Sequence, residues 1–315
     1  MQLPLGIISN ESYTSSKTGD RRYGFGGHQT FPFRHGWLKK AVDGVEEDPK
    51  LLSQDRAIAE LGVGKNMVQS IRHWGLATRL LEEAKGGALH PSPLGKSLMK
   101  EWDPYLEDPA SLWLVHWLLV SNTSRATTWN LAFTRFTRPE FTKAELLGFV
   151  ANFVERNGLR VNENTLSRDI DCFVRTYVPS KTSDRSLPED SFDCPLVDLC
   201  LLHLVYGGDG YQFTVGPKAT LPVEIFGFAL LQYISQVRAG RQTISLQDCL
   251  YGVGSPGQVF KLDENSLVEY VEALQELSGW AIEFDETAGL SQIYLRKRHE
   301  PLELLQGYYE RRLQA

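Results

Sequence analysis

The chain has 315 residues, 42% of them hydrophobic and 23% charged, with a formal net charge of −6. This composition is ordinary for a soluble globular protein of two or three domains. The longest apolar run, Leu112–Val120, is about half the ~20 residues that a membrane-spanning helix needs, so a membrane protein is not expected. Residues 1–20 are polar and lack the features of a signal peptide, which predicts a flexible arm.

Four cysteines stand among apolar neighbours without forming a C-x-x-C pair: Cys172, Cys194, Cys200 and Cys249. This pattern favours buried free thiols in a reducing cytoplasm over disulfides or a zinc site. We therefore expect a cytoplasmic protein.

The charges are unevenly distributed along the chain. Residues 21–100 carry 13 Lys and Arg against 8 Asp and Glu, a local balance of +5 that leaves −11 for the rest. Such asymmetry indicates that one end meets a polyanion, although chance clustering on a solvated surface is the alternative.

The folded part opens with RRYGFGGHQTFPFRHGWLKKAVDGV, starting at Arg21. Phe31, Phe33 and Trp37 are expected to anchor this segment in a core. Two interpretations of its polar residues stay open: a phosphate-handling cluster in which a histidine moves protons, or a loop whose charges are solvated. The catalytic candidates of the first interpretation are His28, Arg34, His35 and Lys39.

A helix-turn-helix pattern follows. Ser53 is placed to cap a helix through DRAIAEL, and Gly62 and Gly64 permit the turn after it. The next helix, 65–74, has an apolar face of Met67, Val68, Ile71 and Trp74. Its polar face suits contacts with phosphates and base edges, although winged helices also bind proteins. With one lysine from the preceding segment, the DNA-binding candidates are Lys40, Lys65, Asn66, Gln69, Arg72 and His73.

After this helix, TRLL and GGALHPS predict two short strands around a Gly-Gly turn, and PLGKSLMKEW predicts a closing helix. The order is that of a winged helix, so we assign residues 21–102 to an N-terminal winged-helix DNA-binding domain.

Residues 103–180 are predicted to be a helical middle domain. Its last helix presents Leu166, Ile170, Phe173 and Tyr177 on one face and nearly balanced charges on the other, which favours an architectural role. Residues 181–193 form a polar connector. Carboxylates here suit a hard cation such as Mg²⁺ or Mn²⁺, with a solvated surface as the alternative. The metal candidates are Asp169, Asp171, Asp190 and Asp193.

The C-terminal region, 194–315, repeats a helix–helix–hairpin order that ends in WAIEFDETAGLSQIYLRK. This order predicts a second winged-helix module. The expected fold class is therefore mainly α with short β-hairpins (α+β), with winged helix-turn-helix modules at both ends joined by a helical middle.

The segments FGGHQTFPFRHGWLKKAVDGV and AIAELGVGKNMVQSIRHWGLA, with DPASLWLVHWLL and SPGQVFKLDENSL, resemble a bacterial family built around one uncharacterised domain. Its members are encoded in DNA phosphorothioation and phage-defence clusters beside an ATPase, a cysteine desulfurase and a sulfurtransferase-like pyrophosphatase. Over about residues 23–305 the chain resembles the SspB type, the nicking component. The resemblance implies that the protein binds double-stranded DNA and nicks one strand, but it brings no catalytic motif.

Two hypotheses from different classes remain. The first is a DNA nicking endonuclease that hydrolyses a phosphodiester with a metal ion or a histidine. The second is a non-enzymatic winged-helix adaptor or regulator that binds DNA and recruits partner proteins. A homodimer is expected in either case, because winged-helix proteins often pair to cover two half-sites.

Overall fold

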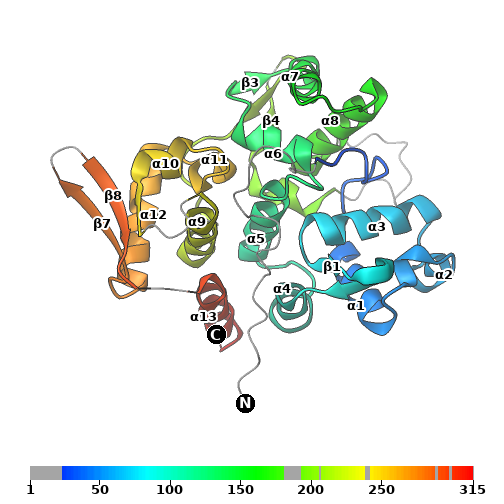
Figure 1. Cartoon of the computed structure of the whole chain (residues 1–315), viewed down its shortest axis with the longest axis horizontal. Helices are drawn as coiled ribbons and strands as arrows, with labels where there is room; N and C mark the ends of the chain where they lie inside the picture. The colour runs from blue at the N-terminus through cyan, green and yellow to red at the C-terminus, as the bar shows by residue number, and fades with distance from the viewer. Residues whose placement is uncertain are drawn as a thin grey trace.

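Helix α5 (Pro109–Val120) lies in the middle of the molecule (Figure 1). The computed structural model describes residues 23–180, 193–205, 207–237, 242–287, 290–297 and 300–314, so the predicted arm and Asp190 lie outside it. Every residue from Ala110 to Val120 is buried, as expected for a helix that is apolar around its whole circumference. Within the described ranges, no helix is long and apolar enough to span a bilayer.

The elements on one side of α5 come from the N-terminal third of the chain (Figure 1). The hairpin β1–β2 is antiparallel, with Leu81 opposite Pro91 and Glu83 opposite Leu89. In chain order these elements are α1 (Trp37–Glu47), η1 (Leu51–Ser53), α2 (Ala57–Leu61), α3 (Lys65–Ala77), β1 (Leu81–Glu83), η2 (Lys85–Gly87), β2 (Leu89–Pro91), α4 (Pro93–Lys96) and the π-helix η3 (Ser97–Trp102).

Two local predictions in this region were wrong. Ser53 does not cap α2, because it lies in the 3-10 helix η1 and the N-cap residue of α2 is Arg56. The first strand begins at Leu81 rather than Thr78. Thr78 donates its hydroxyl to the Trp74 carbonyl, and Arg79 has a left-handed φ of 57°, so both residues belong to the end of α3.

A second group of elements covers one end of α5. The strand β3 precedes the connector in the chain, yet it pairs with β5, which follows the connector, in a sheet ordered β3-β5-β4. The group consists of α6 (Thr127–Thr134), β3 (Glu140–Phe141), α7 (Lys143–Arg156), α8 (Glu163–Tyr177), η5 (Pro195–Leu199), β4 (Leu202–Leu204) and β5 (Tyr211–Phe213).

The third group lies on the other side of α5 and includes a three-stranded antiparallel sheet ordered β6-β8-β7. Its elements are α9 (Val223–Val237), β6 (Thr243–Ser245), α10 (Leu246–Tyr251), α11 (Pro256–Phe260), α12 (Glu264–Leu277), β7 (Ile282–Thr287), β8 (Leu290–Leu295) and α13 (Pro301–Gln314). The predicted hairpin is present, with Phe284 opposite Ile293.

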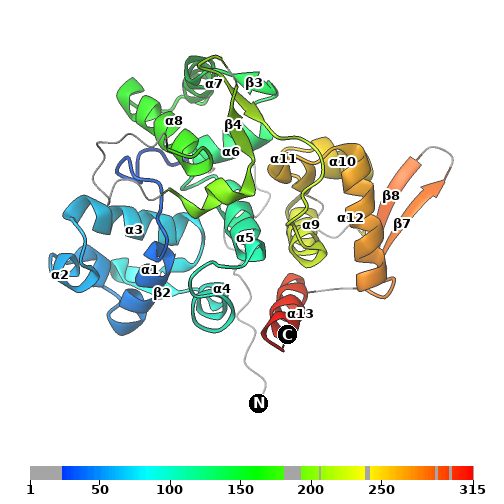
Figure 2. The ribbon, with the colours of Figure 1, turned by 180° about the vertical axis from the view of Figure 1, so that it is seen from behind.

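Helix α13 returns from this third group to the N-terminal elements (Figure 2). It packs along α9, the Tyr309 ring stacks on Trp102 with centroids 4.6 Å apart, and the Tyr309 hydroxyl lies 2.8 Å from Ser111 Oγ on α5. The two ends of the described chain therefore share one core.

His116, in the middle of α5, is the polar centre of that core. Its Nδ1 lies 2.8 Å from the Tyr177 hydroxyl and its Nε2 lies 2.9 Å from the Val259 carbonyl oxygen. A carbonyl only accepts, so Nε2 carries the proton and Nδ1 accepts from Tyr177. Burial lowers the pKa of His116 to about 3, so the ring is neutral.

The expected fold class, mainly α with short antiparallel hairpins, is confirmed. The order α2, α3, β1, β2, α4 agrees with the element order predicted for the N-terminal region. The winged-helix interpretation of either end, and the domain boundaries, stay predictions.

Candidate nucleic-acid interface

Helix α3 divides into an anchored and an exposed side. Val68, Ser70, Ile71 and Trp74 are buried. Ser70 Oγ donates to the His28 carbonyl and Trp74 Nε1 donates to the Phe31 carbonyl, which fixes α3 to the segment before α1. The exposed side presents three of the predicted DNA-binding side chains, Lys65, Asn66 and Gln69.

Arg72 lies at the edge of the exposed side and is held by a neighbouring strand. Its Nη2 is 2.8 Å from Glu83 Oε1 at the end of β1, and Arg125 Nη2 approaches the other oxygen of the same carboxylate at 2.5 Å. Two guanidinium groups thus converge on one exposed carboxylate beside α3.

His73, the last predicted DNA-binding residue on α3, turns inward instead. Its ring packs against Gly27, where an added Cβ would collide with it, and its centroid is 5.9 Å from that of His28. Burial, with smaller contributions from His28 and Arg125, lowers the pKa of His73 to about 3. The imidazole is neutral and offers no charge to a phosphate.

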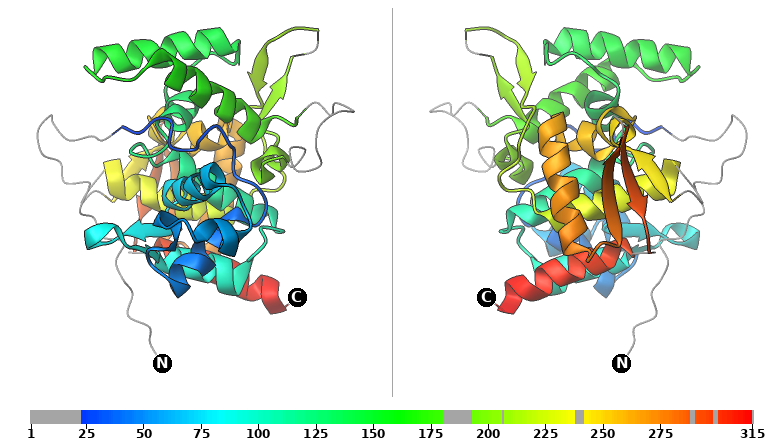
Figure 3. Two further views of the ribbon diagram at one scale, coloured as in Figure 1. Left: turned by 90° about the vertical axis from the view of Figure 1, so that its right-hand side faces the viewer. Right: turned by 90° about the vertical axis from the view of Figure 1, so that its left-hand side faces the viewer.

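His28 and Asp169 form a buried pair that joins the N-terminal segment to α8. Figure 3 shows the blue N-terminal segment passing beside the green helices. His28 Nδ1 accepts the Thr30 backbone N–H, so Nε2 carries the proton that it donates to Asp169 Oδ1 over 2.9 Å. The same carboxylate accepts the Gly26 backbone N–H at 2.7 Å and the Thr128 hydroxyl at 2.9 Å. The Asp169 carboxylate therefore accepts hydrogen bonds from three donors, and both His28 nitrogens have hydrogen-bond partners inside the protein.

The other metal candidates lie apart from this pair. Asp171 is exposed and its carboxylate is 2.6 Å from Lys143 Nζ. Asp193 accepts both the backbone N–H and the hydroxyl of Ser180, at 2.9 and 2.6 Å, which brings the two ends of the connector together. Within the residues that the structure describes, no group of three His, Cys, Asp or Glu side chains is placed to hold a metal ion.

The remaining predicted side chains lie around the start of α1. The Arg34 guanidinium lies over the rings of Phe31 and Trp37, 5.9 and 5.6 Å from their centroids. Lys39 Nζ is 2.8 Å from Asp43 Oδ2. Lys40 donates to the Leu61 carbonyl at the end of α2 over 2.8 Å, so it stabilises that helix end.

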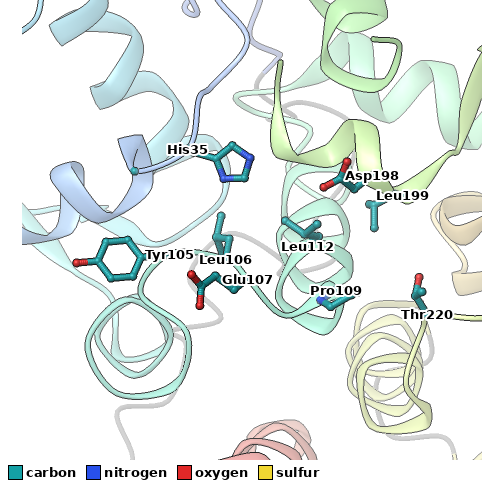
Figure 4. A pocket seen from close by; sticks show the side chains of 10 residues that line it. His35, Tyr105, Leu106, Glu107, Pro109, Leu112, Asp198, Leu199 and Thr220 are labelled. Atoms are coloured by element: carbon teal, nitrogen blue, oxygen red, sulfur yellow. The ribbon is translucent and has the colours of Figure 1, made fainter. Parts of the chain in front are cut away.

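His35 is exposed and lies on the wall of a cavity of about 560 Å³ (Figure 4). Asp198 on η5 lies across the cavity from His35, and Glu107, from the loop before α5, forms part of the wall below. The cavity is lined by His35, Gly36, Tyr105, Leu106, Glu107, Pro109, Leu112, Asp198, Leu199 and Thr220. An imidazole and two carboxylates thus share an open space of small-molecule size.

Comparison with known proteins places the chain in a family. A family model described as "Protein of unknown function (DUF4007)" matches residues 25–309. The chain belongs to the DUF4007 family. No curated protein matches it at a significant level.

Two solved structures of SspB are similar to this DUF4007 protein along most of its length. A crystal structure of SspB is 30% identical to it, with a TM-score of 0.82 over 91% of this chain and 88% of the other. A magnesium ion-bound crystal structure of SspB is 29% identical, with the same TM-score and coverage. The predicted resemblance to the SspB type, and to a family built around one uncharacterised domain, is confirmed.

The sequence interpretation did not include Arg125 and Glu83, which this DUF4007 protein places beside α3. Arg125 lies in a polar turn and Glu83 lies in a strand, and neither position stands out by periodicity or motif. Only the tertiary contact between segments 42 residues apart reveals them.

Proposed function

We propose that this protein binds double-stranded DNA and nicks one strand as part of a bacterial phosphorothioate-modification and phage-defence system. The likeness to SspB over about nine-tenths of both chains carries this proposal. The basic N-terminal region and the exposed polar side of α3 support the DNA-binding part of it.

The DNA contact is assigned to the region from α2 to β2, interpreted as a winged helix. Lys65, Asn66 and Gln69 have long donor-bearing side chains on one exposed helix surface, as a recognition helix needs to reach base edges and phosphates. Ser70 and Trp74 hold the opposite side rigidly to the domain. This support fixes the backbone positions from which the three side chains extend outward.

The chemistry of nicking is assigned to the cavity at the start of α1. Hydrolysis of a phosphodiester needs an activated water, neutralised phosphoryl oxygens and a proton for the leaving oxygen. We propose His35 as the proton-transfer group, because it is exposed on the cavity wall, whereas both nitrogens of His28 are engaged internally. Arg34 and Lys39 are the neighbouring cations.

Mg²⁺ or Mn²⁺ is the proposed cofactor, supported by the magnesium ion-bound SspB structure. Glu107 and Asp198 at the cavity have the oxygen donors that Mg²⁺ prefers. They do not form part of a three-residue metal-ligating group among the described residues. We therefore assign no step of the reaction to the ion.

The proposed partners are the ATPase, the cysteine desulfurase and the sulfurtransferase-like component of the modification system, and the proposed assembly state is a homodimer in the cytoplasm. The alternative function, a non-enzymatic DNA-binding adaptor, uses the same surface of α3. The two functions differ in whether DNA is cut.

The deciding experiment incubates the purified protein with supercoiled plasmid in Mg²⁺, in Mn²⁺ and in EDTA. Open-circle product that disappears in EDTA supports a metal-dependent nickase. His35→Gln should abolish nicking while the melting temperature and DNA affinity stay unchanged. A salt-sensitive gel shift without cutting under any condition would favour the adaptor.

A further inference from the structure

We propose that Arg72 and Arg125 form a clamp for a DNA backbone phosphate, and that Glu83 occupies this clamp as an internal anion when DNA is absent. The proposal rests on the DNA-binding part of the proposed function and extends the interface beyond α3. It assigns a ligand class, a phosphodiester, to two guanidinium groups.

The three side chains come from three different elements and meet at the surface. Arg72 projects from α3, Glu83 ends β1, and Arg125 lies in the turn between α5 and α6. Their side chains are 30%, 41% and 36% exposed, so an external anion can reach the point where they converge.

The turn that carries Arg125 is fixed to the end of α3. Asn122 donates its side-chain amide to the Ala77 carbonyl over 2.9 Å, and Ser124 donates its hydroxyl to Asn122 over 2.9 Å. Gly24 packs against this turn so closely that a Cβ would collide with the Ser124 carbonyl. The two arginines are therefore held on one rigid frame, as a preformed anion site requires.

The chemistry of the clamp suits a phosphate better than a carboxylate. Glu83 offers two oxygens, one to each guanidinium, and Arg72 Nε is left buried without an acceptor among the described residues. A phosphodiester carries the same single charge on two tetrahedrally placed non-bridging oxygens, with two ester oxygens as weaker acceptors, and planar guanidinium groups bind it with paired hydrogen bonds. An exposed ion pair contributes little to stability, so exchanging Glu83 for phosphate costs little.

Removing the internal anion should strengthen DNA binding. Glu83→Gln frees two guanidinium groups, so we expect affinity for a fluorescently labelled duplex to rise about 3- to 10-fold, with a steeper dependence on salt. Arg125→Ala should weaken binding, reduce the slope of log K against log salt by about one, and cancel the gain of Glu83→Gln in the double variant. Anisotropy titrations at several salt concentrations measure each quantity.

An exposed ion pair elsewhere provides the matched control. Arg138 pairs with Glu145 near the start of α7, so Arg138→Ala and Glu145→Gln change charge equally without touching the clamp. The clamp proposal is contradicted if Glu83→Gln weakens DNA binding. It is also contradicted if the clamp variants behave like these controls while the parent protein binds DNA. If the parent protein itself fails to bind DNA, the proposed function fails first. If millimolar inorganic phosphate displaces DNA at constant ionic strength, the ligand of the clamp is free phosphate rather than the DNA backbone.

Discussion

Two aspartates on α8, two positions apart, have opposite surroundings. Asp169 is buried and accepts three hydrogen bonds, whereas Asp171 is exposed and pairs only with Lys143 among the described residues. We expect Asp169→Ala to lower the free energy of unfolding by about 2–4 kcal/mol, because it leaves buried donors without an acceptor. Asp171→Ala should cost under about 1 kcal/mol. Urea denaturation of both variants measures the difference, and equal effects would contradict this view of Asp169.

His116, which is fully buried, and His73, which is partly buried and faces inward, should make the protein sensitive to mild acid. Burial lowers the pKa of His73 and of His116 to about 3, below the usual value of about 6.5. As the pH falls, each of these histidines therefore binds a proton in the unfolded chain before it does so in the folded chain. The neutral histidines contribute their full stabilisation of the folded state above pH 6.5, and this contribution is lost as the pH falls toward 3. We expect the free energy of unfolding to fall by up to about 1.4 kcal/mol per pH unit per histidine between pH 6 and 5.

His73→Leu provides the test of this pH dependence. His73 Nε2 has no hydrogen-bond partner within the described chain, so removing this nitrogen leaves no other group without a partner. The slope of stability against pH should be roughly halved in urea denaturation. An unchanged slope would show that His73 does not contribute.

Single residues could be placed from the sequence only where local periodicity decides. The exposed positions of Lys65, Asn66 and Gln69 follow from a helical period of 3.6, and the structure agrees with it. The burial of His28 depends on Asp169, which lies 141 residues away, and no local pattern encodes that contact. The same reasoning explains why Arg125 was missed.

At the scale of elements, α3 is the helix with the clearest experimental consequence. We expect Lys65→Ala combined with Arg72→Ala to weaken duplex binding and to reduce its salt slope by about one to two units. Arg168→Ala on the exposed side of α8 should leave both unchanged, because that helix is interpreted as architectural. Gel shifts at graded salt concentrations distinguish the two helices, and an equal loss for Arg168→Ala would extend the interface to α8.

Long helices were predictable because each carries an apolar stripe or, like α5, an apolar circumference. Short strands were less predictable from the sequence. Strand β3 has two residues and β6 has three, and each exists only because a partner strand pairs with it. Their positions depend on tertiary contacts rather than on their own sequence.

At the scale of the whole molecule, α13 ties the C-terminal group to the rest of the core. Leu305 is fully buried, whereas Leu313 on the same helix is 62% exposed. We expect Leu305→Ala to lower the free energy of unfolding by about 2–5 kcal/mol and Leu313→Ala by under about 0.5 kcal/mol. Circular dichroism and tryptophan fluorescence should report one coincident shift. A loss confined to a minor early transition would mean that α13 unfolds separately.

The contact between Ser180 and Asp193 has a practical consequence for engineering. Ser180 precedes residues 181–192 in the chain and Asp193 follows them, and the two are joined by hydrogen bonds to the Asp193 carboxylate. Doubling the length of a loop whose ends already meet costs only about 0.6 kcal/mol of closure entropy. An epitope tag as long as residues 181–192, inserted between Ser180 and Asp193, would therefore leave the fold intact and let antibodies detect the protein.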